Sequence, residues 1–125
     1  YDLRYRDGAE RFECGTMNPF GIAALGSSLE ILLEAGESDI ERQVRILTDL
    51  LVVGLMDRGY RVISSRKDGE WSGIVTATHV DQNPNELVQR LKQRGVSVAA
   101  RAGRLRISPH FYNTVDEVDQ LLAAL

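Results

Sequence analysis

The stretch "RLRISPHFYNTVDEVDQLL", residues 104–122, joins a strand pattern directly to a helix pattern. Arginine alternates with leucine and isoleucine over residues 104–107, which is typical of a strand with one buried face. Thr114 and Glu117 then have the spacing of a capping box, and the apolar residues that follow recur at helical spacing. The stretch therefore predicts a strand over residues 104–108, a corner, and a helix that begins after Thr114.

Three further helices are predicted outward from this stretch, each from an N-terminal signal followed by apolar residues at helical spacing. They are expected from Asn18-Pro19 to about Gly36, from a capping box of Ser38 and Glu41 to Gly59, and from Asn83-Pro84 to Gly95. Between them, residues 60–65 and 73–80 are rich in β-branched residues and flank a turn-prone Lys67-Asp68-Gly69, which predicts a hairpin.

A second hairpin is predicted where residues 96–101 and 104–108 flank Ala102-Gly103. The resulting order, α-α-β-β-α-β-β-α, predicts an α+β fold, an antiparallel sheet with helices packed on one face. The order of the strands in that sheet does not follow from the sequence.

Composition limits the classes of function. The chain has 125 residues, 43% hydrophobic and 26% charged, which is the size and make-up of one globular domain, and no apolar run is long enough to span a membrane. A net charge of −3 argues against a nucleic-acid partner. The single cysteine, Cys14, allows no internal disulfide, which fits a cytoplasmic location, and no metal site is expected from the two histidines. Arginine supplies 13 of the 15 basic residues, which favours pairing with carboxylates and phosphates.

Two short segments are candidates for binding anions. On a strand, Arg106 points away from Leu105 and Ile107, so its guanidinium could hold a carboxylate with two hydrogen bonds; it could equally be a solvated residue or half of a surface ion pair. Gly15-Thr16 precedes a capped helix, where backbone N–H groups and the helix dipole favour a phosphate, although capping alone would explain Asn18.

Both segments belong to longer motifs that resemble one family. "RFECGTMNPFGIAALGSSLEILLEAG", residues 11–36, and "LRISPHFYNTVDEVDQLLAAL", residues 105–125, resemble the C-terminal part of class V aminotransferases, which are fold type I enzymes that depend on pyridoxal phosphate (PLP). Cysteine desulfurases and isopenicillin N epimerase-like proteins belong to this family. The resemblance implies a small C-terminal domain over residues 19–125, a leading segment over residues 1–18 with a partner-facing loop, and a homodimer.

The resemblance also implies roles for individual residues. Arg106 would bind the α-carboxylate of an amino-acid substrate, and Thr16 with Gly15 would reach the phosphate of the PLP held by the partner subunit. Tyr112, Asn113 and Thr114 would build the corner that holds Arg106 in place.

The resemblance leaves the catalytic lysine unassigned. Lys67 lies in a predicted turn and Lys92 on the exposed side of a helix, so neither is expected to bond PLP as a Schiff base. That lysine is expected in a large domain preceding Tyr1, and this fragment alone is expected to be inactive.

The sequence leaves open the type of reaction and an alternative function. Cysteine desulfurases carry a nucleophilic cysteine shortly before the carboxylate-binding arginine, but "RGVSVAARAGRLRIS", residues 94–108, contains none, so an aminotransferase, epimerase or lyase is expected instead. Cys14 is expected to be a packing residue. The alternative is a free-standing α+β module that binds a ligand or a protein without catalysis.

Overall fold

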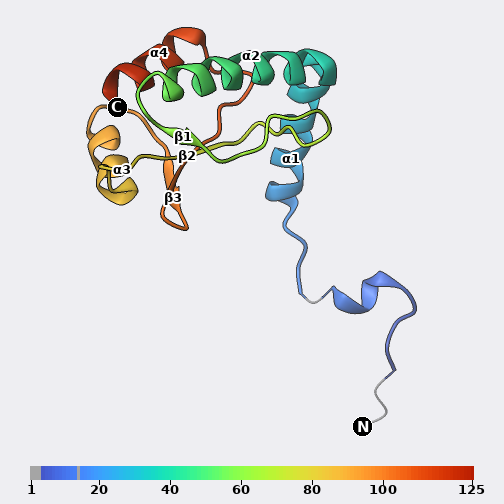
Figure 1. Cartoon of the computed structure of the whole chain (residues 1–125). Coiled ribbons are helices and arrows are strands. Elements are labelled where there is room, and N and C mark those ends of the chain that lie inside the picture. The colour runs from blue at the N-terminus through green and yellow to red at the C-terminus, as the bar shows by residue number, and fades with distance from the viewer. Residues whose placement is uncertain (1–3, 14) are drawn as a thin grey trace. The chain divides into compact units, whose positions relative to one another are not determined.

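The computed structural model describes residues 4–13 and 15–125, which form parts of two compact units, Tyr1–Glu34 and Ala35–Leu125. Figure 1 shows the whole chain, coloured from blue at the N-terminus to red at the C-terminus. The elements occur in the predicted order, with one additional 3₁₀ helix, η1 (Ala9–Phe12), near the N-terminus. Among the helices described, none is both long enough and apolar enough to cross a membrane.

The first unit consists mainly of η1 and of helix α1 (Pro19–Ala35). Asn18 caps α1 as predicted, because its side-chain oxygen accepts a hydrogen bond from Gly21 N at 2.9 Å. The backbone oxygen of Asn18 accepts the first helical bond, from Ile22 N at 3.0 Å. No residue of α1 is buried, although the helix carries many large apolar side chains.

The second unit begins with helix α2 (Glu37–Met56), whose start differs from the prediction. The expected capping box of Ser38 and Glu41 is wrong: Gly36 is the N-cap residue and makes no side-chain hydrogen bond. Only Gly36 separates α1 from α2, so Ser38 already lies within the first turn and cannot cap it. The C-terminal signal is confirmed, because Gly59 has a left-handed φ of 79° and Tyr60 N donates to Leu55 O at 3.0 Å.

Four antiparallel strands form one sheet in the order β1-β2-β4-β3. They are β1 (Arg61–Val62), β2 (Val75–Thr78), β3 (Ala99–Arg101) and β4 (Arg104–Ile107), so both predicted hairpins are confirmed. The first hairpin is shorter than predicted because Ile63 N and Ser64 N both donate to Thr76 O, while Ser64 Oγ accepts from Thr76 N. Ile63 and Ser64 thus lie together opposite Thr76, as in a β-bulge, and regular pairing of the two strands ends there.

The helices of the second unit pack on one face of this sheet, as the sequence predicts. Helix α2 contacts β1 and β2, α3 (Pro84–Gln93) contacts β3 and β4, and α4 (Val115–Ala124) contacts α2. Figure 1 shows α2 and α4 together above the strands. The core between the layers includes Leu47, Leu51, Leu55, Val75, Ala77, Leu87, Leu91, Leu105, Ile107, Val118 and Leu121.

Gly54 lets α2 and α4 approach closely. A Cβ atom at this position would overlap the side chain of Leu122 and would lie 2.9 Å from its Cδ2 atom. Leu122 is buried, so it has little room to move away. We therefore predict that Gly54→Ala lowers the free energy of unfolding by about 1–3 kcal/mol, despite the better helix propensity of alanine.

Equilibrium denaturant unfolding tests this prediction, with Val53→Ala as the matched control on the same helix. Val53 is 59% exposed, and its truncation should change the free energy of unfolding by less than about 0.5 kcal/mol. Equal stability of Gly54→Ala and the parent chain would show that α4 is not packed against Gly54.

Candidate functional site

Arg106 lies on the face of the sheet opposite the helices. It pairs with Thr76 on β2 and with Ala99 on β3, so β4 holds it between two neighbouring strands. Its neighbours Leu105 and Ile107 are 2% and 5% exposed and belong to the core. The predicted alternation of β4 is thus confirmed, and the half-buried Arg106 points away from the core.

The guanidinium of Arg106 makes no hydrogen bond or ion pair with any residue of the described part of the chain. Other arginines of the same unit do find partners: Arg66 bonds Asp49 and Thr48, and Arg42 bonds Asp39 at 2.6 Å. A guanidinium has five N–H donors, and Arg106 is half-buried as a residue. The donors of Arg106 are therefore left to solvent or to a ligand.

The chain leaves β4 through a corner fixed by Asn113. The Asn113 side-chain oxygen accepts from His110 N at 2.8 Å, and Asn113 N donates to His110 O at 3.0 Å. The Asn113 backbone oxygen also accepts from Gln43 Nε2 of α2 at 3.4 Å. These bonds close the corner at the end of the Arg106 strand and connect it to α2.

The capping box after this corner is confirmed. Thr114 N donates to Glu117 Oε2 at 2.9 Å, and Glu117 N donates to Thr114 Oγ1 at 3.3 Å. Asn113 Nδ2 donates to the same carboxylate oxygen at 3.0 Å. The hydrogen bond from Asn113, and next that from Thr114 N–H, lower the pKa of Glu117 because both favour its charged form.

Gly15 and Thr16 belong to the first unit and Arg106 to the second. Gly15 has a left-handed φ of 93°, and a Cβ atom there would meet nothing within 4 Å. Glycine is favoured by the backbone conformation rather than by lack of space. The Thr16 hydroxyl is exposed and makes no hydrogen bond within residues 4–13 and 15–125, and Cys14 lies outside the described residues.

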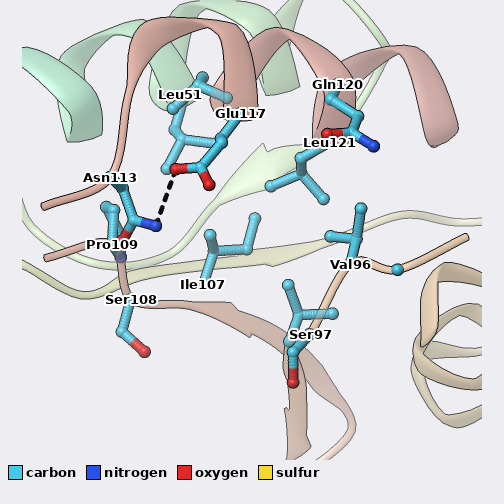
Figure 2. A pocket seen from close by; sticks show the side chains of 13 residues that line it. Leu51, Val96, Ser97, Ile107, Ser108, Pro109, Asn113, Glu117, Gln120 and Leu121 are labelled. Atoms are coloured by element: carbon cyan, nitrogen blue, oxygen red, sulfur yellow. Dashed lines mark hydrogen bonds between the residues drawn. The ribbon is translucent and has the colours of Figure 1, made fainter.

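A hollow of about 290 Å³ lies on the helix side of the sheet and was not anticipated from the sequence. Its floor is apolar, with Leu51, Ile107 and Leu121, and Figure 2 shows the hydrogen-bonded pair of Asn113 and Glu117 beside these residues. Ile107 lines this hollow and Arg106 does not, so the hollow is separate from the arginine face. No sequence signal marks it, because its walls come from loops and helices far apart in the chain.

The residues required for PLP chemistry are only partly present. Lys67 and Lys92 are both exposed, so neither lies in the enclosed surroundings expected of a Schiff-base lysine. Thr16 offers a free hydroxyl that fits one contact to a phosphate. Across the described ranges, no three His, Cys, Asp or Glu side chains are arranged to hold a metal ion.

The fold and these motifs define a class of protein. The family model Aminotransferase class-V matches residues 1–121, and the chain therefore belongs to this family. The family that the two sequence motifs indicated is thus confirmed.

The relatives include an uncharacterized aminotransferase, YcbU, of Bacillus subtilis, 29% identical over 118 residues that cover 94% of this chain and 31% of the relative. A probable cysteine desulfurase of Pyrococcus abyssi is 26% identical and is matched over 93% of this chain and 32% of its own.

Solved structures agree on the fold. The apo cysteine desulfurase of Thermococcus onnurineus NA1 has a TM-score of 0.87 at 24% identity, over 96% of this chain and 33% of that protein. A NifS-like protein has a TM-score of 0.79 at 27% identity, over 97% of this chain and 36% of the other. The chain spans about a third of the length of the relatives it matches.

Glu117 should make the stability of the corner depend on pH. Its pKa is lowered in the folded chain, so its contribution is present above the usual carboxylate range and is lost as the pH falls through its folded pKa. We predict that Glu117→Gln lowers the melting temperature at neutral pH and that the difference from the parent chain shrinks in acid.

Melting temperatures measured between neutral and acidic pH check this prediction. Asp119→Asn is the charge control, because it removes a carboxylate from the same helix. The Asp119 carboxylate is exposed and makes no hydrogen bond with the described residues. A difference between Glu117→Gln and the parent that stays constant with pH would contradict the role of the Glu117 carboxylate.

Proposed function

We propose that this chain is the substrate-recognising small domain of a PLP-dependent class V enzyme that acts on an amino acid. The observation that carries the proposal is that Arg106, a half-buried residue in the middle of the sheet, has no partner for its guanidinium among the described residues. An amino-acid substrate presents a carboxylate, which is the planar acceptor that a guanidinium binds with two parallel hydrogen bonds.

Arg106 would orient the substrate as well as bind it. Two parallel hydrogen bonds fix the plane of the carboxylate, so the amino group and Cα of the substrate take a defined direction. Backbone pairing to β2 and β3 holds the Cα atom of Arg106, and the Asn113 corner holds the end of β4. The rigid support favours a defined position for the substrate.

PLP, when bound, supplies an electron sink that stabilises negative charge at the substrate Cα. Within this chain, Thr16 with Gly15 would contribute one hydrogen bond to the cofactor phosphate, across the interface of a homodimer. Neither lysine has the surroundings to bond the cofactor, so we place the Schiff-base lysine in a part of the protein outside these residues. We further propose that the dimer works in the cytoplasm.

The type of reaction is proposed from the hairpin that precedes Arg106. Arg101 pairs directly with Arg104, so only Ala102 and Gly103 form the turn, with left-handed φ values of 49° and 71°. Such a two-residue turn has no room for a loop bearing a nucleophilic cysteine. We therefore propose an aminotransferase, epimerase or lyase reaction for this chain, although two of its relatives are named probable cysteine desulfurases.

The experiment that tests the proposal is an absorbance titration of the complete gene product with PLP. We expect a visible band from lysine-bound cofactor, and borohydride reduction followed by peptide mapping should locate PLP on a lysine other than Lys67 or Lys92. Thr16→Ala should raise the dissociation constant of PLP about tenfold, since a hydrogen bond to a charged group is lost, and Thr16→Ser should restore it. No band in the complete protein would instead favour the free-standing binding module.

A second prediction concerns Arg106. In the complete protein, Arg106→Lys should raise KM for amino-acid substrates about 10- to 100-fold, because an ammonium group cannot form the two parallel hydrogen bonds. PLP binding should not change. The control is Arg42→Lys, since Arg42 is exposed and pairs with Asp39. Unchanged steady-state kinetics in Arg106→Lys would remove the assigned role.

A further inference from the structure

We propose that Arg101 and Arg104 form a second anion-binding position beside Arg106, so that the substrate is an amino acid with an acidic group in its side chain. The inference rests on the proposed function, in which Arg106 binds the α-carboxylate. It names the substrate class, which the family alone leaves open.

The three arginines share the open face of the sheet. Arg101 on β3 pairs directly with Arg104 on β4, so their side chains lie on the same face. Arg104 precedes Arg106 by two residues on one strand, which puts it on that face as well, about 7 Å along the strand. Arginine side chains are long enough to converge over this distance on the two ends of a small dianion.

Charge on this face is unbalanced. The positions that share the face with Arg106 on the four strands are Arg61, Thr76, Thr78, Ala99, Arg101 and Arg104. They include no acidic residue, and within the described chain neither Arg101 nor Arg104 has a hydrogen bond or ion pair. Like charges directly opposite each other on a sheet are unfavourable, so the Arg101–Arg104 pair lacks a counter-charge that a ligand would supply.

The hairpin holds this pair in place. In the turn, both Ala102 and Gly103 have a left-handed backbone conformation. This type of turn fixes the register in which Arg101 pairs with Arg104 and opposes a shift of one strand along the other. Ala102 adopts this conformation without the freedom of glycine, so the turn is strained. A fixed pair of guanidinium groups suits a carboxylate or a phosphate, since both accept several N–H donors at once.

The test compares isosteric substrates with the complete, PLP-loaded protein. Dissociation constants from the change in the PLP spectrum, and kcat/KM, are measured for L-glutamate, L-glutamine, L-aspartate, L-asparagine and O-phospho-L-serine. We expect L-glutamate and L-aspartate to bind about tenfold or more tightly than L-glutamine and L-asparagine, and to have a correspondingly higher kcat/KM. The reason is that the amide cannot form the charged hydrogen bond that the carboxylate forms. Tighter binding of O-phospho-L-serine than of L-glutamate and L-aspartate would identify the second anion as a phosphate. The reverse order would identify it as a side-chain carboxylate. Either order supports the proposal.

Matched variants separate this site from Arg106. Arg104→Gln and Arg101→Gln should each abolish the preference for the acidic members and leave L-glutamine within about threefold of the parent, whereas Arg106→Lys should weaken all substrates alike. Arg61→Gln is the control, because Arg61 shares the face but lies on β1, which β2 separates from β4.

Three results would overturn the inference. Equal binding of L-glutamate and L-glutamine would remove the second anion position while leaving Arg106 and the proposed function intact. Failure to bind any amino acid, in a protein that holds PLP, would remove the proposed function as well. If Arg104→Gln lowers the melting temperature and weakens both members of a pair equally, Arg104 pairs with an acidic residue of the protein rather than with substrate.

Discussion

The register of β4 between β2 and β3 is the constraint on which the rest of the structure depends. Because side chains on a strand alternate with a period of two, a slip of one residue would move Arg106 into the core and expose Leu105. Burial of Leu105 and Ile107 opposes such a slip from the helix side. At the two ends of β4, the Ala102-Gly103 turn and the Asn113 corner oppose it through hydrogen bonds and backbone conformation. The core and the candidate site therefore depend on the same few backbone bonds.

Sequence reasoning succeeded where the signal is local. Several local signals are confirmed, namely the Asn18 and Thr114 caps, the Gly59 terminus and the β3–β4 hairpin, each of which depends on residues within a few positions of one another. The β1–β2 hairpin is confirmed as well, although residues 63–74 separate its two strands. The start of α2 was predicted wrongly because the competing influence was the end of α1, which left only Gly36 as a connection. A cap signal is correct only where the chain has room for a non-helical residue before it.

The arrangement of the candidate site could be predicted from the sequence only in part. The alternation over residues 104–107 was enough to place Arg106 opposite the core, but its lack of a partner depends on what the other strands bring near it. Arg61 and Arg104 come to the same face only because β4 pairs with β2, which joins the two hairpins into one sheet. The 290 Å³ hollow likewise requires knowledge of how α4 packs beside the α3–β3 loop. The roles of Gly15 and Thr16 stay predictions that follow from the resemblance.

Natural sequences usually agree with their fold at every level, and departures tend to occur where function has its own requirements. The β3–β4 hairpin contains two departures: an alanine with φ of 49° in the turn, and two arginines directly opposite each other before and after it. A hairpin of ordinary stability would use Asn-Gly or Asp-Gly in the turn and opposite charges across it. Both departures lie within five residues of Arg106, on the strand pair that carries the proposed carboxylate site. Their coincidence on one hairpin is better explained by a requirement for positive charge at this face than by packing, because the packing role on β4 is already filled by Leu105 and Ile107.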